Sequence, residues 1–128
     1  MTKQIIKTEN APAPIGPYNQ AVKAGDTIYL SGQIALHPTT GELMTHDIEV
    51  ETHQVMQNIK AILDACKISF EHVVKTTIFL SDMDLFAKVN EIYGSYFTGD
   101  YPARETVAVK TLPRNVHVEI SMIAIQHL

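Results

Sequence analysis

The chain has 128 residues, of which 45% are hydrophobic and 19% are charged, as is typical of a globular domain and not of a disordered chain. Its length suits a single domain, residues 1–128, whose core needs neither disulfides nor a structural metal. The formal net charge of −4 and the dispersed lysines and arginines disfavour a nucleic-acid binder. Because we find no secretory signal and no long apolar run, we expect a cytoplasmic protein that does not enter a membrane.

The first third of the chain predicts an irregular proline-rich segment followed by a hairpin. Three prolines lie within residues 11–17, where they fix the backbone and remove hydrogen-bond donors. Residues 18–24 and 27–36 have the composition of strands, and Gly25-Asp26 between them suits a tight turn.

A helix is predicted from about Asp47 to Lys67, because its apolar residues recur at helical spacing. Glu49 and Glu51 suit the positive end of this helix dipole, and the position of Cys66 on the apolar stripe predicts a buried, unreactive thiol. The stripe consists of Val55, Ile59, Ile62, Leu63 and Cys66.

The second half of the chain predicts one strand, one helix and two further strands. The β-branched run 73–80 is typical of a strand, and Asp82 or Asp84 can cap a helix that extends to about residue 97. Strands are then expected at 104–111 and 116–125. This order of elements predicts an α+β fold with both helices on one face of a sheet.

For the last two strands we predict antiparallel pairing, with Val107 opposite Ile120, because this register gives one clean apolar side. The helices would cover the valine side, and Arg104 and Glu119 would share the polar side, which must meet water or another subunit. The two side chains would lie about 13 Å apart along this hairpin. One small substrate could then touch both only if they came from neighbouring chains.

Arg104 and Glu119 are the main candidates for residues with a chemical role. Arg104 opens a strand, where its fork of donors would fit a carboxylate, but spacing alone favours a solvated arginine at the sheet rim. Glu119 is either a carboxylate on a wet sheet face, which spacing alone favours, or an acid and base in a half-closed site. Gly32, next to Ser31, indicates close backbone approach to another group, and the missing Gly-x-Ser-x-Gly elbow makes Ser31 an unsuitable triad nucleophile.

The densest set of potential metal ligands lies at the start of the first helix. His46 and His53 are seven residues apart, whereas paired ligands on a helix usually stand three or four apart. We therefore predict an exposed first helical turn and no metal site. The set comprises His46, Asp47, Glu49, Glu51 and His53.

Eight short motifs occur together in the order and spacing of one protein family. On these motifs the chain resembles the RidA (YjgF) family of reactive-intermediate imine deaminases over nearly its whole length. The motifs are residues 15–18 (IGPY), 31–34 (SGQI), 41–42 (GE), 75–80 (KTTIFL), 89–90 (VN) with Tyr93, 101–104 (YPAR), 112–113 (LP) and 118–120 (VEI).

The resemblance implies a chorismate-mutase-like α+β domain with one mixed sheet, and a homotrimer with clefts between its subunits. It implies hydrolysis of 2-imino acids, such as 2-iminobutanoate and 2-iminopropanoate, to 2-keto acids and ammonia, with no cofactor. By the same resemblance, Arg104 would bind the substrate carboxylate and Glu119 would position the hydrolytic water. Residues that would line the pocket are Tyr18, Ser31, Gly32 and Asn90.

Two positions beside the arginine depart from the family pattern. Glu105 replaces a residue that is usually small, and Thr106 replaces a frequent cysteine. Strand alternation predicts that Thr106 shares the face of Arg104 and touches the ligand, whereas Glu105 points away. We therefore expect these positions to affect substrate preference more than the reaction.

The sequence thus predicts an imine deaminase, with two alternatives. One is a regulatory module that uses Arg104 to hold a small carboxylate and performs no catalysis. The other is a ribonuclease or translation inhibitor, against which the acidic balance of the chain counts. Of these, only the enzyme requires Glu119 as a proton carrier.

Overall fold

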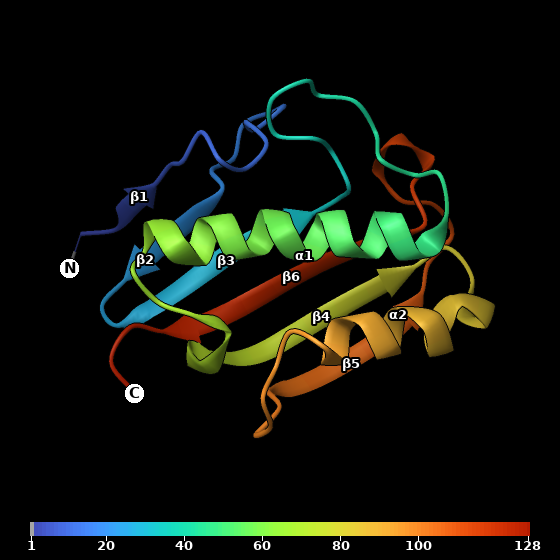
Figure 1. Cartoon of the computed structure of the whole chain (residues 1–128). Helices are drawn as coiled ribbons and strands as arrows, with labels where there is room; N and C mark the ends of the chain where they lie inside the picture. The colour runs from blue at the N-terminus through green and yellow to red at the C-terminus, as the bar shows by residue number, and fades with distance from the viewer. Residues whose placement is uncertain (1) are drawn as a thin grey trace.

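The computed structural model describes residues 2–128 and consists of one six-stranded sheet with two helices on one of its faces (Figure 1). The α+β fold with a mixed sheet is therefore confirmed. The strands are β1 (Gln4–Ile6), β2 (Ala21–Ala24), β3 (Thr27–Gln33), β4 (Val73–Leu80), β5 (Ala103–Ala108) and β6 (Val118–Ile125), and the helices are α1 (Ile48–Ala65) and α2 (Phe86–Gly94). Across the sheet the strands run in the order β1-β2-β3-β6-β4-β5.

Helix α1 forms as the apolar spacing predicts. Asp47 caps it, accepting a hydrogen bond from the backbone N–H of Val50, which satisfies one of the unpaired donors of the first turn. Its apolar stripe from Val55 to Leu63 is fully buried against the sheet. Cys66 ends the helix and is half-buried, more accessible than predicted, and burial raises the pKa of its thiol.

The pairing of the last two strands differs from the prediction. β5 does not pair with β6; it lies at the edge of the sheet, parallel to β4, with Arg104 opposite Thr76. The connection from β4 to β5 contains α2, and such a crossover is what parallel neighbours require. β6 is instead inserted between β3 and β4 and runs antiparallel to both.

This topology reverses the predicted orientation of β5. On β6, Val118 and Ile120 face the helices and are fully buried, as predicted. On β5 the pairing with buried Thr76 puts Arg104 on the same helix-covered face, whereas Val107 is 46% exposed on the open face. The prediction that Arg104 and Glu119 share a face was therefore wrong.

The remaining differences concern short strands and one buried carboxylate. β1 was not predicted, and β3 ends at Gln33, earlier than expected, with a bulge between Leu30 and Gln33. Glu51, predicted on an exposed helical turn, is fully buried. Among residues 2–128, no helix is long and apolar enough to cross a membrane.

Candidate active site

Arg104 is held in a defined position by α2. Its Nη1 donates a 2.6 Å hydrogen bond to Oδ1 of Asn90, and its Cζ lies 5.2 Å from the ring centre of Tyr93 and 5.6 Å from that of Phe86. Such ring contacts attract a guanidinium through the negative face of the ring. The contact between Arg104 and Asn90 brings together two residues that the sequence assigned to one pocket.

The arginine borders an open hollow of about 570 Å³ between α2 and the start of β5. Among the described residues, no carboxylate forms an ion pair with Arg104. Its remaining N–H groups are therefore available to a ligand in a geometry that fits a carboxylate. Besides Arg104 and Asn90, the lining residues are Glu91, Tyr93, Gly94, Tyr101 and Pro102.

Thr106 lies two residues further along β5 on the same face as Arg104. Its Oγ1 is buried and has no hydrogen-bond partner within residues 2–128. A buried hydroxyl without a partner is uncommon in folded proteins, and Thr106 does not line the hollow beside Arg104. Glu105 points to the opposite face, where it forms a 2.8 Å ion pair with Lys75, as predicted.

Tyr93 and Phe86 are site residues that sequence reasoning did not assign to chemistry. Tyr93 is almost fully buried, its hydroxyl donates to Thr76, and burial raises the pKa of its phenol. Both rings lie within the segment predicted as the second helix. Their spacing indicated packing, but only the position of β5 beneath α2 shows that they pack against an arginine.

Glu119 lies on the open face of the sheet, opposite Phe79 of β4. Its carboxyl is half-buried, and this desolvation raises its pKa. Within residues 2–128 it forms no hydrogen bond or ion pair. The carboxyl packs on Gly32, where an added Cβ would lie 2.9 Å from Cδ of Glu119. The close approach that the sequence predicted at Gly32 is thus an approach to Glu119.

Ser31 and Tyr18 do not line the hollow beside Arg104. Ser31 precedes Gly32 in the bulged part of β3, and its hydroxyl donates a 2.5 Å hydrogen bond to the carbonyl of Asn19. Tyr18 is 46% exposed, and its hydroxyl accepts a hydrogen bond from the backbone N–H of Ile15.

Five of the residues selected from the sequence therefore form two groups on opposite faces of the sheet. Arg104 and Thr106 lie on the face covered by α2, with Asn90 of that helix above them, whereas Glu119 and Gly32 lie on the open face. β4 separates β5 from β6, and strand spacings give roughly 14 Å between the backbones of Arg104 and Glu119. Within one chain, a small molecule cannot contact both side chains.

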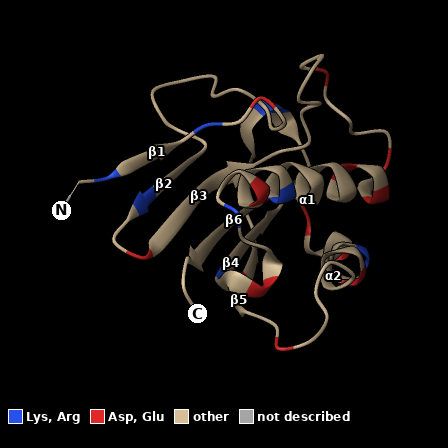
Figure 2. Ribbon diagram, turned by 60° about the vertical axis from the view of Figure 1, so that its left-hand side comes forward, with Lys and Arg blue, Asp and Glu red and all other residues tan. Residues whose placement is uncertain are grey.

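Neither metal binding nor a basic surface stands out in the described part of the chain. No group of three or more histidine, cysteine or acidic side chains there could hold a metal ion. Lysines and arginines are dispersed over strands, helices and loops instead of gathering on one element (Figure 2).

These features define an α+β domain with an arginine-lined hollow suited to a small carboxylate. A model of the family described as Endoribonuclease L-PSP matches residues 8–126. The chain belongs to this family, which includes the proteins named RidA and YjgF that its motifs resemble.

Individual relatives cover almost the whole chain. A mouse protein named 2-iminobutanoate/2-iminopropanoate deaminase is 48% identical over 97% of this chain and 92% of its own. The crystal structure of a candidate endoribonuclease from Thermotoga maritima superposes with a TM-score of 0.94 at 49% identity, covering 97% of this chain and 98% of that one. The crystal structure of E. coli TdcF with bound serine superposes with a TM-score of 0.91 at 39% identity, covering 95% of this chain and 98% of that one.

Proposed function

We propose that this protein is an imine deaminase, which hydrolyses 2-imino acids such as 2-iminobutanoate and 2-iminopropanoate to 2-keto acids and ammonia. The observation that carries the proposal is Arg104, held by Asn90 and two rings with its other donors open to a hollow. The mouse relative bears the name of this activity. Serine bound to TdcF shows that a relative takes a small molecule with a carboxylate.

Arg104 would act as a clamp that binds the substrate carboxylate and so orients the substrate. A 2-imino acid carries its carboxylate next to the electrophilic imine carbon. Two parallel hydrogen bonds from Arg104 to the carboxylate fix the direction in which that carbon faces. Thr106 lies two residues from Arg104 on the same face of β5, so its side chain would shape the surroundings of the arginine.

Glu119 would move the protons. As a base it takes a proton from water while the water oxygen bonds to the imine carbon, giving a tetrahedral carbinolamine. As an acid it returns this proton to the nitrogen, which completes the carbinolamine. It then takes the proton of the carbinolamine hydroxyl and passes it to the nitrogen while the carbon–oxygen double bond forms and the carbon–nitrogen bond breaks, so that the 2-keto acid and ammonia leave. The raised pKa of Glu119 makes it a better base than an exposed carboxylate, and no cofactor takes part in these steps.

The same proposal requires a site between chains. Because Arg104 and Glu119 lie on opposite faces of one sheet, one substrate can reach both only if each comes from a different copy of the chain. We propose a homotrimer with three such clefts. The open face also carries exposed Tyr29 opposite Ile123 of β6, apolar surface that a second copy would cover.

An ammonia-release assay tests the activity. Imines generated from several amino acids are supplied to the wild-type protein and to Glu119→Gln. We expect the wild type to release ammonia, and the variant to lose most of this activity while still binding a 2-keto acid, because glutamine keeps the shape but cannot accept the proton. Hydrolysis that survives within a few-fold would support a carboxylate-binding module in place of an enzyme.

A mixing experiment tests the shared site. Arg104→Ala chains and Glu119→Gln chains are each inactive alone, but a mixed trimer contains one cleft with both residues intact. Random exchange at equal amounts should restore about a quarter of wild-type activity, since three-quarters of the trimers are mixed and each has one intact cleft of three. No recovery, with mixed trimers confirmed by mass, would place the site within one chain.

Ribonuclease activity has less support, although the family description names an endoribonuclease. A nucleic-acid site needs basic side chains along a phosphate backbone. In this chain they are dispersed (Figure 2), and the net charge is −4.

A further inference from the structure

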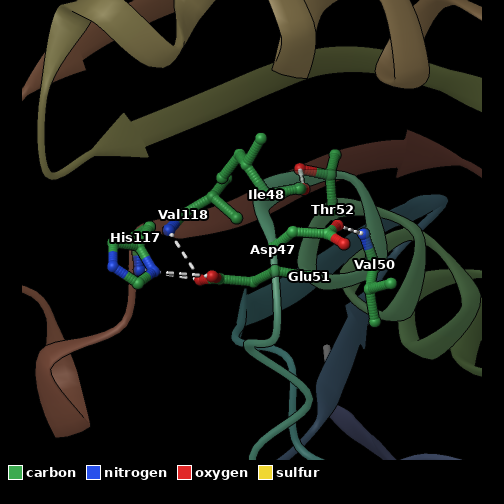
Figure 3. A network of polar contacts seen from close by, with 7 residues as sticks. All are labelled: Asp47, Ile48, Val50, Glu51, Thr52, His117 and Val118. Carbon is green, nitrogen blue, oxygen red and sulfur yellow. Dashed lines mark hydrogen bonds and ion pairs between the residues drawn. The ribbon is translucent and has the colours of Figure 1, made fainter.

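A buried carboxylate of α1 holds the beginning of β6 (Figure 3). Glu51 is completely buried, and its Oε2 accepts hydrogen bonds from the backbone N–H groups of His117, at 2.7 Å, and Val118, at 3.2 Å. Its Oε1 lies 2.7 Å from Nδ1 of His117. Because an ionised carboxylate only accepts hydrogen bonds, Nδ1 carries the proton in this contact.

The carboxylate of Glu51 lies beside the first residues of β6, which are not paired with β3. Pairing between β3 and β6 ends at Gln33 and Ile120, so the first residues of β6 have a strand partner on the β4 side alone. There Leu80 pairs with Val118, and the N–H of Ser81 donates to the carbonyl of His117. On the helix side, Glu51 supplies the acceptors that buried N–H groups require.

We propose that Glu51 is a positioning residue for Glu119 and acts through the backbone of β6. The inference rests on the proposed function. Glu119 directly follows Val118, and its carboxyl packs on Gly32 with no hydrogen bond within residues 2–128 to fix it. The place of this carboxyl therefore depends on the backbone that carries it, and a proton carrier loses efficiency when it leaves hydrogen-bond reach of its substrate.

The arrangement predicts which kinetic constant changes. Arg104 is attached to β5 and to Asn90 of α2, on the far side of β4 from the start of β6. A shift of that start would disturb Glu119 and leave the carboxylate clamp in place. Variants of Glu51 should therefore lower kcat with little change in KM.

Two conservative variants distinguish the length of the side chain at position 51 from its charge. In Glu51→Gln the amide oxygen can accept both backbone N–H groups, and the amide nitrogen can donate to Nδ1 once the imidazole proton moves to Nε2. All three contacts can persist without the charge. Glu51→Asp keeps the charge but shortens the side chain by one bond of about 1.5 Å, so it cannot span the contacts from the same backbone position.

We expect kcat of Glu51→Gln within about threefold of wild type and kcat of Glu51→Asp lower by about tenfold or more, with KM unchanged in both. Thr52→Val is the matched control, because this neighbouring hydroxyl is also buried but donates to Ile48 within the helix. It should lose stability without losing kcat. Thermal unfolding and 2-keto acid binding show that each variant is folded.

The outcomes are distinguishable. A Glu51→Asp variant with wild-type kcat, or a Glu51→Gln variant worse than Glu51→Asp, overturns the positioning role while Glu119→Gln remains inactive. If Glu119→Gln itself hydrolyses imines, the proposed function fails, and the positioning of Glu119 fails with it. Equal losses in kcat for Thr52→Val would show a general effect of stability.

Discussion

The two faces of the sheet prepare their polar groups differently. Beneath α2, Arg104 has a hydrogen-bond partner and two aromatic neighbours before any ligand arrives. On the open face, Glu119 packs against the backbone of Gly32 and has a raised pKa because water is excluded from part of it. The guanidinium of Arg104 is thus held by neighbouring side chains, whereas the carboxyl of Glu119 has no polar partner among residues 2–128 and meets the proposed need for a group that exchanges a proton.

Replacement of Arg104 should have the largest effect. Arg104→Lys keeps the charge but loses the parallel donors, the bond to Asn90 in its present geometry and the ring contacts. We expect kcat/KM to fall by about a hundredfold, or about 3 kcal/mol of transition-state stabilisation, nearly as much as in Arg104→Ala. Steady-state ammonia release measures it.

Arg114→Lys provides the control for that substitution, since this arginine is exposed in the turn before β6 and should leave turnover unchanged. Wild-type-like turnover in a folded Arg104→Lys variant would contradict the binding of the substrate carboxylate by Arg104.

On the open face, Gly32→Ala should reduce kcat by about tenfold. The added Cβ would lie 2.9 Å from Cδ and 3.0 Å from Oε2 of Glu119, so the carboxyl must move. A double-mutant cycle checks the assignment: in a Glu119→Gln background the methyl group should cost no further activity. An equal loss in both backgrounds would show that Gly32 serves something other than Glu119.

Local sequence patterns predicted the bounds of helices and strands better than they predicted which strands pair. The periodicity of Val55, Ile59 and Ile62 placed α1 within two residues of its observed ends, and the β-branched run placed β4 at its observed bounds, 73–80. The pairing of β5 failed because alternation along a strand does not specify its partner. A connection that contains a helix allows parallel return, and here that possibility decides the topology.

In the candidate site, too, local patterns did not predict contacts between residues far apart in the sequence. The family motifs assigned Arg104 and Asn90 to one pocket, and the two side chains form a hydrogen bond. The glycine pattern at Gly32 correctly indicated a close approach. Glu51 lies four residues before Val55 and so continues the apolar stripe, a signal of burial that its charge obscured. Its backbone partners at 117 and 118 are 66 and 67 residues away, and no local pattern reaches that far.

Thr106→Cys should have a smaller effect than either change above. The hydroxyl is buried beside Arg104 without a partner among the described residues, and a thiol is larger and a weaker donor. We expect relative kcat/KM values among imines of different side chains to shift by about threefold while the reaction persists, as is typical of one altered pocket contact. Competition assays with two imines measure the shift, and complete inactivation would contradict a role confined to the pocket.

The smallest expected effect is that of Glu119→Gln on the free energy of unfolding. The sign of this effect tests whether the carboxyl of Glu119 lacks a cationic partner. Burial raises the pKa of Glu119 above its usual 4.5, so the folded chain holds this proton to higher pH than the unfolded chain does. Stability should therefore fall as pH rises from about 4.5 through the raised pKa, and the cost of burying the charge is fully present above it. Glutamine never ionises, so Glu119→Gln should gain stability relative to wild type over this interval, and the difference should be constant below it. Urea unfolding at a series of pH values and one protein concentration measures the difference. The opposite sign would contradict a carboxyl whose charged form is disfavoured by burial.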